Sequence, residues 1–272
     1  MADLNGKTAL ITGASSGIGL EAAVKTARMG ADVVMVARDL QRGEAALKDV
    51  KARSGSEKVR LLLCDFSSQA GVRALAAVYR AENSRLDILV NNAGTICRER
   101  ILTEDGLEQT FAVNHLGYFL LTNLLLDLLE KSAPSRAVVV SSGGHVRGKI
   151  DFENLQYENG GFSAIKSYYR SKLANVLFSN RLSSLLEGKG VTVNSMHPGV
   201  VLTNFWSKAP AIPRPIFAVY KLFLISAEQG GDRIVYLATS PEVEGKSGGY
   251  YKNNRCIDPS RTAQDEALAA RL

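Results

Sequence analysis

The stretch Lys7-Thr8-Ala9-Leu10-Ile11-Thr12-Gly13-Ala14-Ser15-Ser16-Gly17-Ile18-Gly19 is a short apolar run that ends in closely spaced glycines. A helix-like segment follows to about Met29, and a second apolar run spans residues 32–37. This order predicts strand, glycine turn, helix and strand, the βαβ unit of dinucleotide-binding folds. Gly13 would permit the tight turn, while Gly17 and Gly19 would let a pyrophosphate approach the helix N-terminus. A glycine-rich surface turn is the alternative interpretation.

The end of the second predicted strand, Ala37-Arg38-Asp39, bears on the choice of cofactor. A carboxylate at this tip would bind a ribose 2′-hydroxyl, whereas arginine suits a 2′-phosphate through a forked, charge-assisted contact. Arg38 therefore favours NADP(H) over NAD(H). Asp39 belongs either to this tip or to the helix predicted over residues 40–53, as its N-cap.

The alternation of strands and helices continues along the chain. Further strands are predicted over 58–64, 86–90, 137–140, 191–195 and 248–251, and further helices from Ser67 or Ser68 to 82 and over 103–131, 163–188 and 227–239. This pattern predicts an α/β fold for residues 1–272: a single Rossmann-type domain, a doubly wound parallel sheet with helices on both faces. Ligands of such sheets bind at the carboxyl ends of the strands. Asp65-Phe66, Asn91-Asn92-Ala93-Gly94 and Ser141-Ser142 follow such ends, although plain turns are the alternative.

Tyr168 and Lys172 are four residues apart on the helix predicted over 163–188, so they share one helical face. Free tyrosine has a pKa of about 10, and a fixed ammonium one turn away favours the phenolate. The pair is therefore a candidate proton donor to a carbonyl, or acceptor from an alcohol. Tyr169 is rotated by about 100° around the helix from Tyr168, which favours Tyr168 for this role. Surface decoration is the alternative.

Several other segments carry expectations of their own. Asn114 lies in the middle of an apolar helical face, where a polar task or a satisfied core amide would explain it. His197 precedes a proline and is expected to be structural. The segment 205–226 is rich in proline and aromatics, as a lid over an apolar substrate would be. Residues from Asp258 onward are expected to form a loosely held polar tail.

Composition excludes several classes of protein. The chain has 272 residues, 46% of them hydrophobic and 22% charged, which is ordinary for a soluble globular protein. Its net charge of +6 is scattered, so nucleic acid is not an expected partner. The three cysteines, Cys64, Cys97 and Cys256, predict a reducing compartment, no disulfide framework and no metal site. We expect no signal peptide, no membrane span and a cytoplasmic location, with residues 116–129 as a buried helix.

Together these residues resemble the short-chain dehydrogenase/reductase family over about residues 5–255. The matching motifs are the glycine stretch Thr12–Gly19, Asn91–Gly94, Asn114, Ser142, Tyr168 with Lys172, and Pro198-Gly199. The gap of 25 residues between Ser142 and Tyr168, together with the segments 114–117, 148–152 and 171–175, is similar to the retinol dehydrogenase-like branch.

The resemblance implies a role for each matching residue. Tyr168 would be the general acid in reduction and the base in oxidation, and Lys172 would lower its pKa and hold the nicotinamide ribose. Ser142 would hydrogen-bond the substrate oxygen, and Asn114 would position a water that relays protons to Lys172. His145 and Arg147 would line the entrance. The pyrophosphate of the cofactor would contact Gly13, Ser15, Ser16, Gly17, Ile18 and Gly19. Its 2′-phosphate would contact Arg38, and its adenine would contact Asp65 and Phe66. Its ribose side would contact Asn91, Ala93 and Gly94, and its carboxamide would contact Pro198, Gly199, Val201 and Thr203.

The leading hypothesis is an NADP(H)-dependent oxidoreductase that interconverts an aldehyde or ketone and an alcohol, on an apolar substrate that is retinoid-, steroid- or lipid-like. One alternative is a non-catalytic dinucleotide-binding protein that regulates or scaffolds. Another is a family member that uses the same site for isomerisation or dehydration. A homo-oligomer built on the helices of 103–131 and 163–188 is compatible with the sequence, as is peripheral contact of 205–226 with a membrane.

Overall fold

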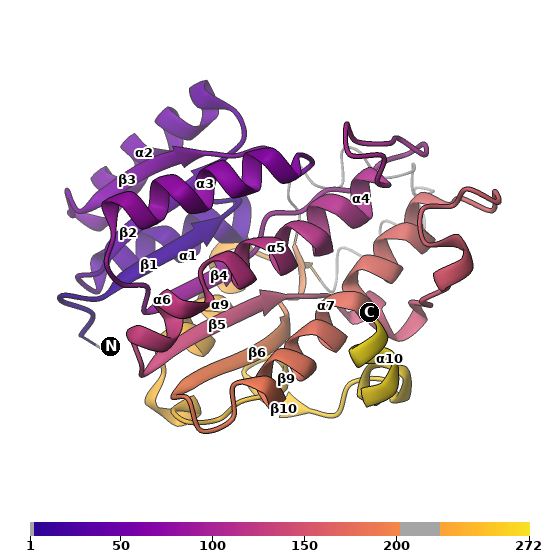
Figure 1. The fold of residues 1–272 in the computed structure, drawn as a ribbon. Helices are drawn as coiled ribbons and strands as arrows, with labels where there is room; N and C mark the ends of the chain where they lie inside the picture. Colours follow the sequence, from indigo (N-terminus) through magenta and orange to yellow (C-terminus); the bar gives the residue numbers. More distant parts are fainter. Residues whose placement is uncertain (1–2, 202–223) are drawn as a thin grey trace.

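The computed structural model describes residues 3–201 and 224–272 of the chain. Their core is an eight-stranded sheet of order β10-β9-β6-β5-β4-β1-β2-β3, in which all neighbours are parallel except β10 and β9 (Figure 1). The strands are β1 (Thr8–Thr12), β2 (Asp32–Ala37), β3 (Val59–Leu63), β4 (Ile88–Asn91), β5 (Ser135–Val140), β6 (Val191–His197), β9 (Tyr250–Lys252) and β10 (Arg255–Ile257). A separate parallel pair joins β7 (Val200–Val201) and β8 (Leu224–Ile225). The predicted Rossmann-type fold is confirmed.

Helices cover both faces of the sheet, as Figure 1 shows. The hydrophobic core on one face lies under α1 (Gly17–Arg28), α2 (Leu40–Ser54) and α9 (Ala227–Thr239). The core on the other face lies under α3 (Gln69–Glu82), α5 (Gly117–Leu124), α6 (Leu126–Lys131) and α7 (Ala164–Leu185). Because strand side chains alternate, neighbouring residues of β1 serve different cores: Leu10 packs on the second face and Ile11 on the first.

The sheet reverses its order of connection between β1 and β4. From β1 the chain winds outward through β2 and β3, and it then returns to the other side of β1 as β4, β5 and β6. The carboxyl ends of β1 and β4 therefore flank a topological switch point, where open α/β sheets bind their ligands. Gly13 follows one of these ends and Asn92 follows the other.

The helix predicted over 103–131 begins later and is interrupted. It consists of α4 (Gln109–Phe111), a π-helical turn (Ala112–Leu116), α5 and α6. Residues 103–108 instead form a turn, in which the Thr103 amide donates to the Leu107 carbonyl at 2.8 Å and Gly106 has a φ of +73°. The Glu108 carboxylate accepts from the amides of Thr110 and Phe111, both at 2.9 Å, and so caps the helix at this point.

The expectation of a loose polar tail after Asp258 is wrong. The chain forms a 3₁₀ turn (Arg261–Gln264) and α10 (Glu266–Arg271), and α10 lies beside α7 at the yellow end of the ribbon (Figure 1). Ala263 is 1% exposed, and Leu268 packs on the apolar cluster of α7. The segment is polar by composition, but Leu268 and Leu272 are four apart and present one apolar face.

Three other expectations concern the described part of the chain and its edges. All but residues 224–226 of the expected lid over 205–226 lie outside the described residues. Cys64, Cys97 and Cys256 form no disulfide with one another in the described part of the chain. Within residues 3–201 and 224–272, no helix is long and apolar enough to cross a membrane.

Candidate active site

The carboxyl end of β5 and the second and third turns of α7 bring Ser142, Tyr168 and Lys172 together. Ser142 and Tyr168 share a hydrogen bond between their side chains. The Lys172 ammonium nitrogen lies 5.7 Å from the ring centre of Tyr168 and 5.9 Å from that of Tyr118. It donates to the carbonyl oxygen of Val140 at 3.0 Å, which ties α7 to the strand that delivers Ser142.

Burial dominates the electrostatics of this cluster. It raises the pKa of Tyr168 to about 12, and the hydrogen bond from Ser142 opposes that rise. Burial also lowers the pKa of Lys172 to about 7. Burial is therefore the dominant influence on the pKa of Tyr168, and a lowering of that pKa by Lys172 stays a prediction. A lysine with a pKa of about 7 is only partly protonated at pH 7, so it lends a phenolate less positive charge than an ordinary lysine would.

Asn114 lies in the π-helical turn and is fully buried. Its side-chain oxygen accepts from the Thr95 amide at 2.7 Å, and its side-chain nitrogen donates to the Thr95 carbonyl at 2.9 Å and to Ser171 Oγ at 3.1 Å. The side-chain amide is thus fully used. The water contact expected of Asn114 would fall on its backbone carbonyl. Such single π turns are frequent at functional sites.

Asn175 is a residue that the sequence interpretation missed as part of this cluster. Its side-chain nitrogen donates to the Asn114 carbonyl at 2.9 Å and to the Val140 carbonyl at 3.3 Å, and its oxygen faces His115 Nδ1 at 3.1 Å. The Val140 carbonyl oxygen therefore accepts hydrogen bonds from both the Asn175 and the Lys172 side chains. The signal that could have found Asn175 is the one that singled out Asn114, an amide inside an apolar helix.

The glycine stretch fits the phosphates of a dinucleotide. Gly13 and Gly17 have φ of +66° and +60°, which favour glycine. A Cβ on Gly19 would lie 2.5 Å from the Gly13 carbonyl oxygen and 2.4 Å from Asn92 Nδ2, so only glycine permits this approach. Ser16 precedes α1 without a side-chain capping bond, which leaves first-turn amides for an anion. Ser15 and Ile18 are partly exposed beside it.

Asn92, which was not assigned a role, holds the glycine stretch to β4. Its amide and that of Ala93 donate to Thr12 Oγ1 at 2.8 and 3.0 Å, and its side chain donates to the Thr12 carbonyl at 2.8 Å. Asn91 is buried and donates to Thr122 Oγ1 at 2.9 Å. Any cofactor contact of Asn91 would therefore use its backbone. Gly94 approaches Asn114, since an added Cβ would lie 3.4 Å from its Oδ1.

The expected adenine end of the site lies beyond β2 and β3. Arg38 is exposed, and among the described residues its guanidinium makes no hydrogen bond or ion pair. Asp39 Oδ1 accepts from the Arg42 amide at 2.8 Å, so Asp39 caps α2. Asp65 is partly exposed and accepts from the Ser67 amide at 2.9 Å. Phe66 is different, because it is buried in the second core against Gly117.

The segment after β6, residues 198–201, is anchored by a hydrogen bond from Arg233 of α9. The Pro198 carbonyl accepts from Arg233 Nη1 at 2.8 Å. Gly199 has a φ of +103°, and a Cβ there would lie 2.5 Å from that same nitrogen. Val201 is buried and pairs with Ile225, whereas Thr203 lies outside the described residues. His197 Nδ1 accepts from the Gly199 amide at 3.4 Å, and burial lowers its pKa to about 4.

The two residues expected at the entrance differ. Arg147 is exposed, but His145 is only 2% exposed and cannot line an entrance. Its ring lies 4.6 Å from that of Tyr250, centre to centre. A histidine in the turn after a candidate catalytic serine looks like a solvent-facing residue in the sequence, and only the C-terminal segment that covers it shows otherwise.

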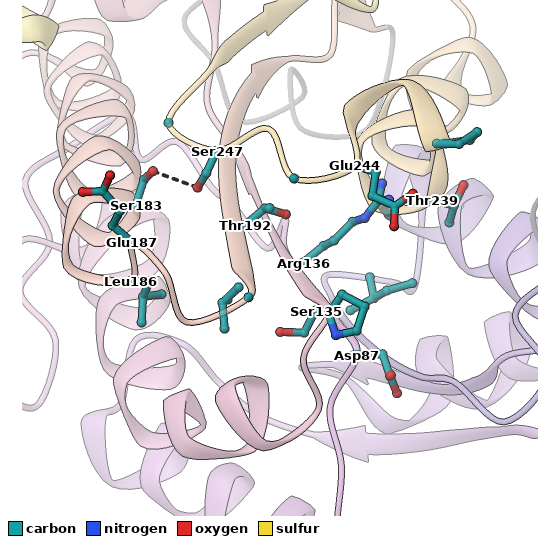
Figure 2. A pocket seen from close by; sticks show the side chains of 18 of the residues that line it. Asp87, Ser135, Arg136, Ser183, Leu186, Glu187, Thr192, Thr239, Glu244 and Ser247 are labelled. Atoms are coloured by element: carbon teal, nitrogen blue, oxygen red, sulfur yellow. Dashed lines mark hydrogen bonds between the residues drawn. The ribbon is translucent and has the colours of Figure 1, made fainter.

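One groove in the described part of the molecule lies away from this cluster. It is an open groove of about 1310 Å³ at the amino ends of β4, β5 and β6 (Figure 2). Its lining includes Asp87, Arg136 and Thr192, and Figure 2 shows the hydrogen bond between Ser183 and Ser247 at its edge. Asp87 is engaged by Lys7, Arg85 and the Thr8 amide. The groove lies at the amino ends of the strands, whereas Tyr168 lies at their carboxyl ends.

Comparison with known proteins agrees with the geometry. The family model of the short chain dehydrogenases matches residues 7–212. The chain belongs to this family. Human retinol dehydrogenase 13 is 40% identical over all of this chain and 83% of its own length, and human retinol dehydrogenase 14 is 42% identical over 99% and 84%.

Solved structures of similar fold extend the comparison. An uncharacterised protein from Mycobacterium paratuberculosis superposes with a TM-score of 0.80 at 31% identity, covering 99% of this chain and 91% of its own. RhlG from Pseudomonas aeruginosa, solved as an NADP active-site complex, superposes with a TM-score of 0.74 at 27% identity, covering 91% and 94%. The likeness of fold to these two structures covers 99% and 91% of this chain.

Proposed function

We propose that this short-chain dehydrogenase is an NADP(H)-dependent oxidoreductase that interconverts an aldehyde or ketone and an alcohol. The observation that carries the proposal is the meeting of Ser142, Tyr168 and Lys172 on the same edge of the sheet as the glycine stretch. A site of this kind needs a proton donor, an oxygen-binding hydroxyl and a dinucleotide cradle, and Tyr168, Ser142 and the glycine stretch are the candidates for these three roles.

The hydrogen bond between Ser142 and Tyr168 brings two hydroxyls to one point. A substrate oxygen at that point would accept from both, with Tyr168 as the acid in reduction and the base in oxidation. Ser142 would orient the oxygen and stabilise its developing charge. Bound NADPH would supply the hydride. Lys172 would hold the cofactor ribose from its position on the same helical face.

The preference for NADP(H) rests on Arg38. Its guanidinium is exposed and unengaged by the described residues, while the carboxylate of Asp39 is occupied as the cap of α2. The tip of β2 thus offers a forked cation to a 2′-phosphate, while Oδ1 of the Asp39 carboxylate is already engaged by the first turn of α2. The NADP in the RhlG complex is a property of that protein, and it agrees with this choice.

An apolar substrate is supported by the surroundings of Tyr168. Tyr168 packs against the buried apolar residues Ile96 and Ala164. Ile165 is 36% exposed one turn earlier, and Val146 is 58% exposed after Ser142. The retinol dehydrogenases among the relatives take their name from an apolar alcohol. We therefore favour a retinoid-, steroid- or lipid-like compound as the substrate.

Cofactor titration followed by a substrate panel tests the proposal. NADPH and NADH are titrated into purified protein by fluorescence, and NADPH consumption is then followed with apolar aldehydes and ketones. The proposal predicts tight NADPH binding and consumption with at least one member. Binding without consumption across the panel would favour a non-catalytic protein, and product without net cofactor turnover would favour isomerisation or dehydration. Failure to bind either nucleotide would overturn the proposal.

A further inference from the structure

We infer that His145 is a positioning residue that fixes the Ser142 turn to the C-terminal segment, residues 258–272. The inference rests on the proposed function, since it concerns the rate at which that site works. Nothing in the local sequence requires it. The link appears only where residues 115 positions apart in the chain, His145 and Ser260, form a hydrogen bond.

The hydrogen bonds of His145 determine its tautomer. Ring Nε2 faces the backbone amide of Ser260 at 3.1 Å, and an amide N–H can only donate. Nε2 must therefore be the acceptor, which leaves the proton of the neutral ring on Nδ1. Nδ1 lies 2.8 Å from the carbonyl oxygen of Ser142, an atom that can only accept. Both nitrogens of the imidazole are thus satisfied in one orientation.

The imidazole anchors the backbone of the proposed catalytic serine. The Ser142 carbonyl receives two hydrogen bonds from His145, one from Nδ1 and one from its amide at 3.1 Å. Ser142 Oγ also accepts from the Gly144 amide at 3.1 Å, so the side chain is part of the same turn. A rotation of this turn would move the Ser142 hydroxyl relative to Tyr168.

The other end of the link is held by the helix that carries Tyr168. The C-terminal segment packs on α7 through Leu268 and Ala263, and Asn180 Nδ2 donates to the Ala263 carbonyl at 2.9 Å. The Arg271 guanidinium lies 4.0 Å from the ring centre of Phe152, in the insertion before α7. Ser260 is therefore placed by α7. The hydrogen bond between His145 and Ser260 thus fixes the position of Ser142 relative to α7, the helix that also carries Tyr168 and Lys172.

A single substitution at Ser260 can remove its hydrogen bond to His145. Ser260 has a φ of −58°, which a proline adopts without strain, and proline lacks the amide hydrogen that reaches His145. The Ser260 hydroxyl has no hydrogen-bond partner among the described residues. Ser260→Pro therefore removes the amide donor, and Ser260→Ala serves as the matched variant that keeps it and sets the baseline for loss of the hydroxyl.

We expect Ser260→Pro to lower kcat roughly five- to tenfold relative to Ser260→Ala, the effect of one lost hydrogen bond on a positioned group, with KM and the NADPH dissociation constant within about twofold. In a Ser142→Ala background the same comparison should show no further loss, because the positioned hydroxyl is already absent. His145→Phe, which keeps a planar ring, should reproduce the loss and should not add to Ser260→Pro.

Backbone amide exchange gives a readout that needs no turnover. Amides of residues 143–148 should exchange faster in Ser260→Pro than in Ser260→Ala, without cofactor or substrate. Equal kcat and equal exchange in the two variants would overturn the inference. An equal loss in the Ser142→Ala background would overturn the positioning role and leave general packing. If the wild-type chain turns over no substrate, the proposed function fails, and the exchange comparison alone decides whether the link exists.

Discussion

The ammonium nitrogen of Lys172 lies 5.7 Å from the ring centre of Tyr168, and its hydrogen bond goes to the Val140 carbonyl, not to a carboxylate. Lys172 is 4% exposed, and none of the described acidic residues forms an ion pair with it. A buried, unpaired ammonium destabilises a fold. A destabilising buried group such as this one, between β5 and α7, is typical of functional sites, where activity can require a residue that lowers the stability of the fold.

Replacement of Lys172 by methionine should stabilise the cofactor-free protein. The pKa of Lys172 is about 7 when folded and about 10.4 in an unfolded chain, so the unfolded state binds the extra proton between these values. Wild-type stability therefore rises with pH across that window, and the full penalty applies below pH 7. We expect Lys172→Met to gain about 1–2 kcal/mol at pH 6.5, with a smaller gain at pH 9.5.

Urea unfolding at both pH values measures this gain. Lys166→Met is the matched control, because Lys166 is exposed on the same helix and should give no such pH-dependent difference. A Lys172→Met protein that is less stable at pH 6.5, or whose gain grows as pH rises, would contradict the account.

Tyr168 and Tyr169 should differ sharply when each is replaced by phenylalanine. Tyr168→Phe removes the proposed acid and should lower kcat by roughly 10²–10⁴-fold, with NADPH affinity nearly unchanged. Tyr169 packs against the Ser142 turn, where a Cβ on Gly144 would lie 2.5 Å from its ring, so Tyr169→Phe keeps that contact. Steady-state kinetics and fluorescence titration compare the pair. A larger loss of kcat in Tyr169→Phe would reverse the assignment.

Arg38→Ala should weaken NADPH and spare NADH. Loss of a forked contact to the 2′-phosphate should raise the NADPH dissociation constant by roughly 10- to 100-fold, while NADH lacks that phosphate. Lys48→Ala removes an equal charge from an exposed position further along α2 and is the control for general electrostatics. Equal weakening of both nucleotides by Arg38→Ala, or none of either, would show that another residue reads the ribose.

Thr12 and Thr8 offer a matched pair within β1. Thr12 Oγ1 accepts from the amides of Asn92 and Ala93 and donates to the Val90 carbonyl at 3.1 Å. Thr12→Val keeps the shape but leaves two partly buried amides without their acceptor, so it should cost about 1–2 kcal/mol and weaken NADPH binding. No hydrogen bond of the described residues involves Thr8 Oγ1, and Thr8→Val should stay within about 0.5 kcal/mol. Equal unfolding midpoints for the two variants would contradict this role of Thr12.

Features set by local spacing could be predicted from the sequence. The glycines of 13–19 sit between a strand and a helix, and the interval from Tyr168 to Lys172 is one helical turn, so neither needed knowledge of distant contacts. The order of strands and helices likewise followed from alternating apolar runs. Each of these depends on residues within about twenty positions of one another.

Features set by distant contacts could not be predicted. The direction of Asn91 depends on Thr122, and the burial of His145 depends on Ser260. The helix begins as late as Gln109 because Glu108 caps it. The Glu108 carboxylate also accepts a hydrogen bond from the Ser167 hydroxyl of α7 at 2.6 Å. The pKa of Lys172 is a consequence of burial, which a helical spacing does not contain.

The central claim is that hydride passes between the nicotinamide and a carbonyl carbon while Tyr168 handles the proton. NADPH carrying deuterium on the reactive face of C4 tests it most directly, with whichever aldehyde or ketone the panel identifies. We predict one deuterium on the carbinol carbon of the product, formed by wild-type protein and almost none by Tyr168→Phe. Product without deuterium at that carbon, with either face of the nicotinamide labelled, would contradict the account.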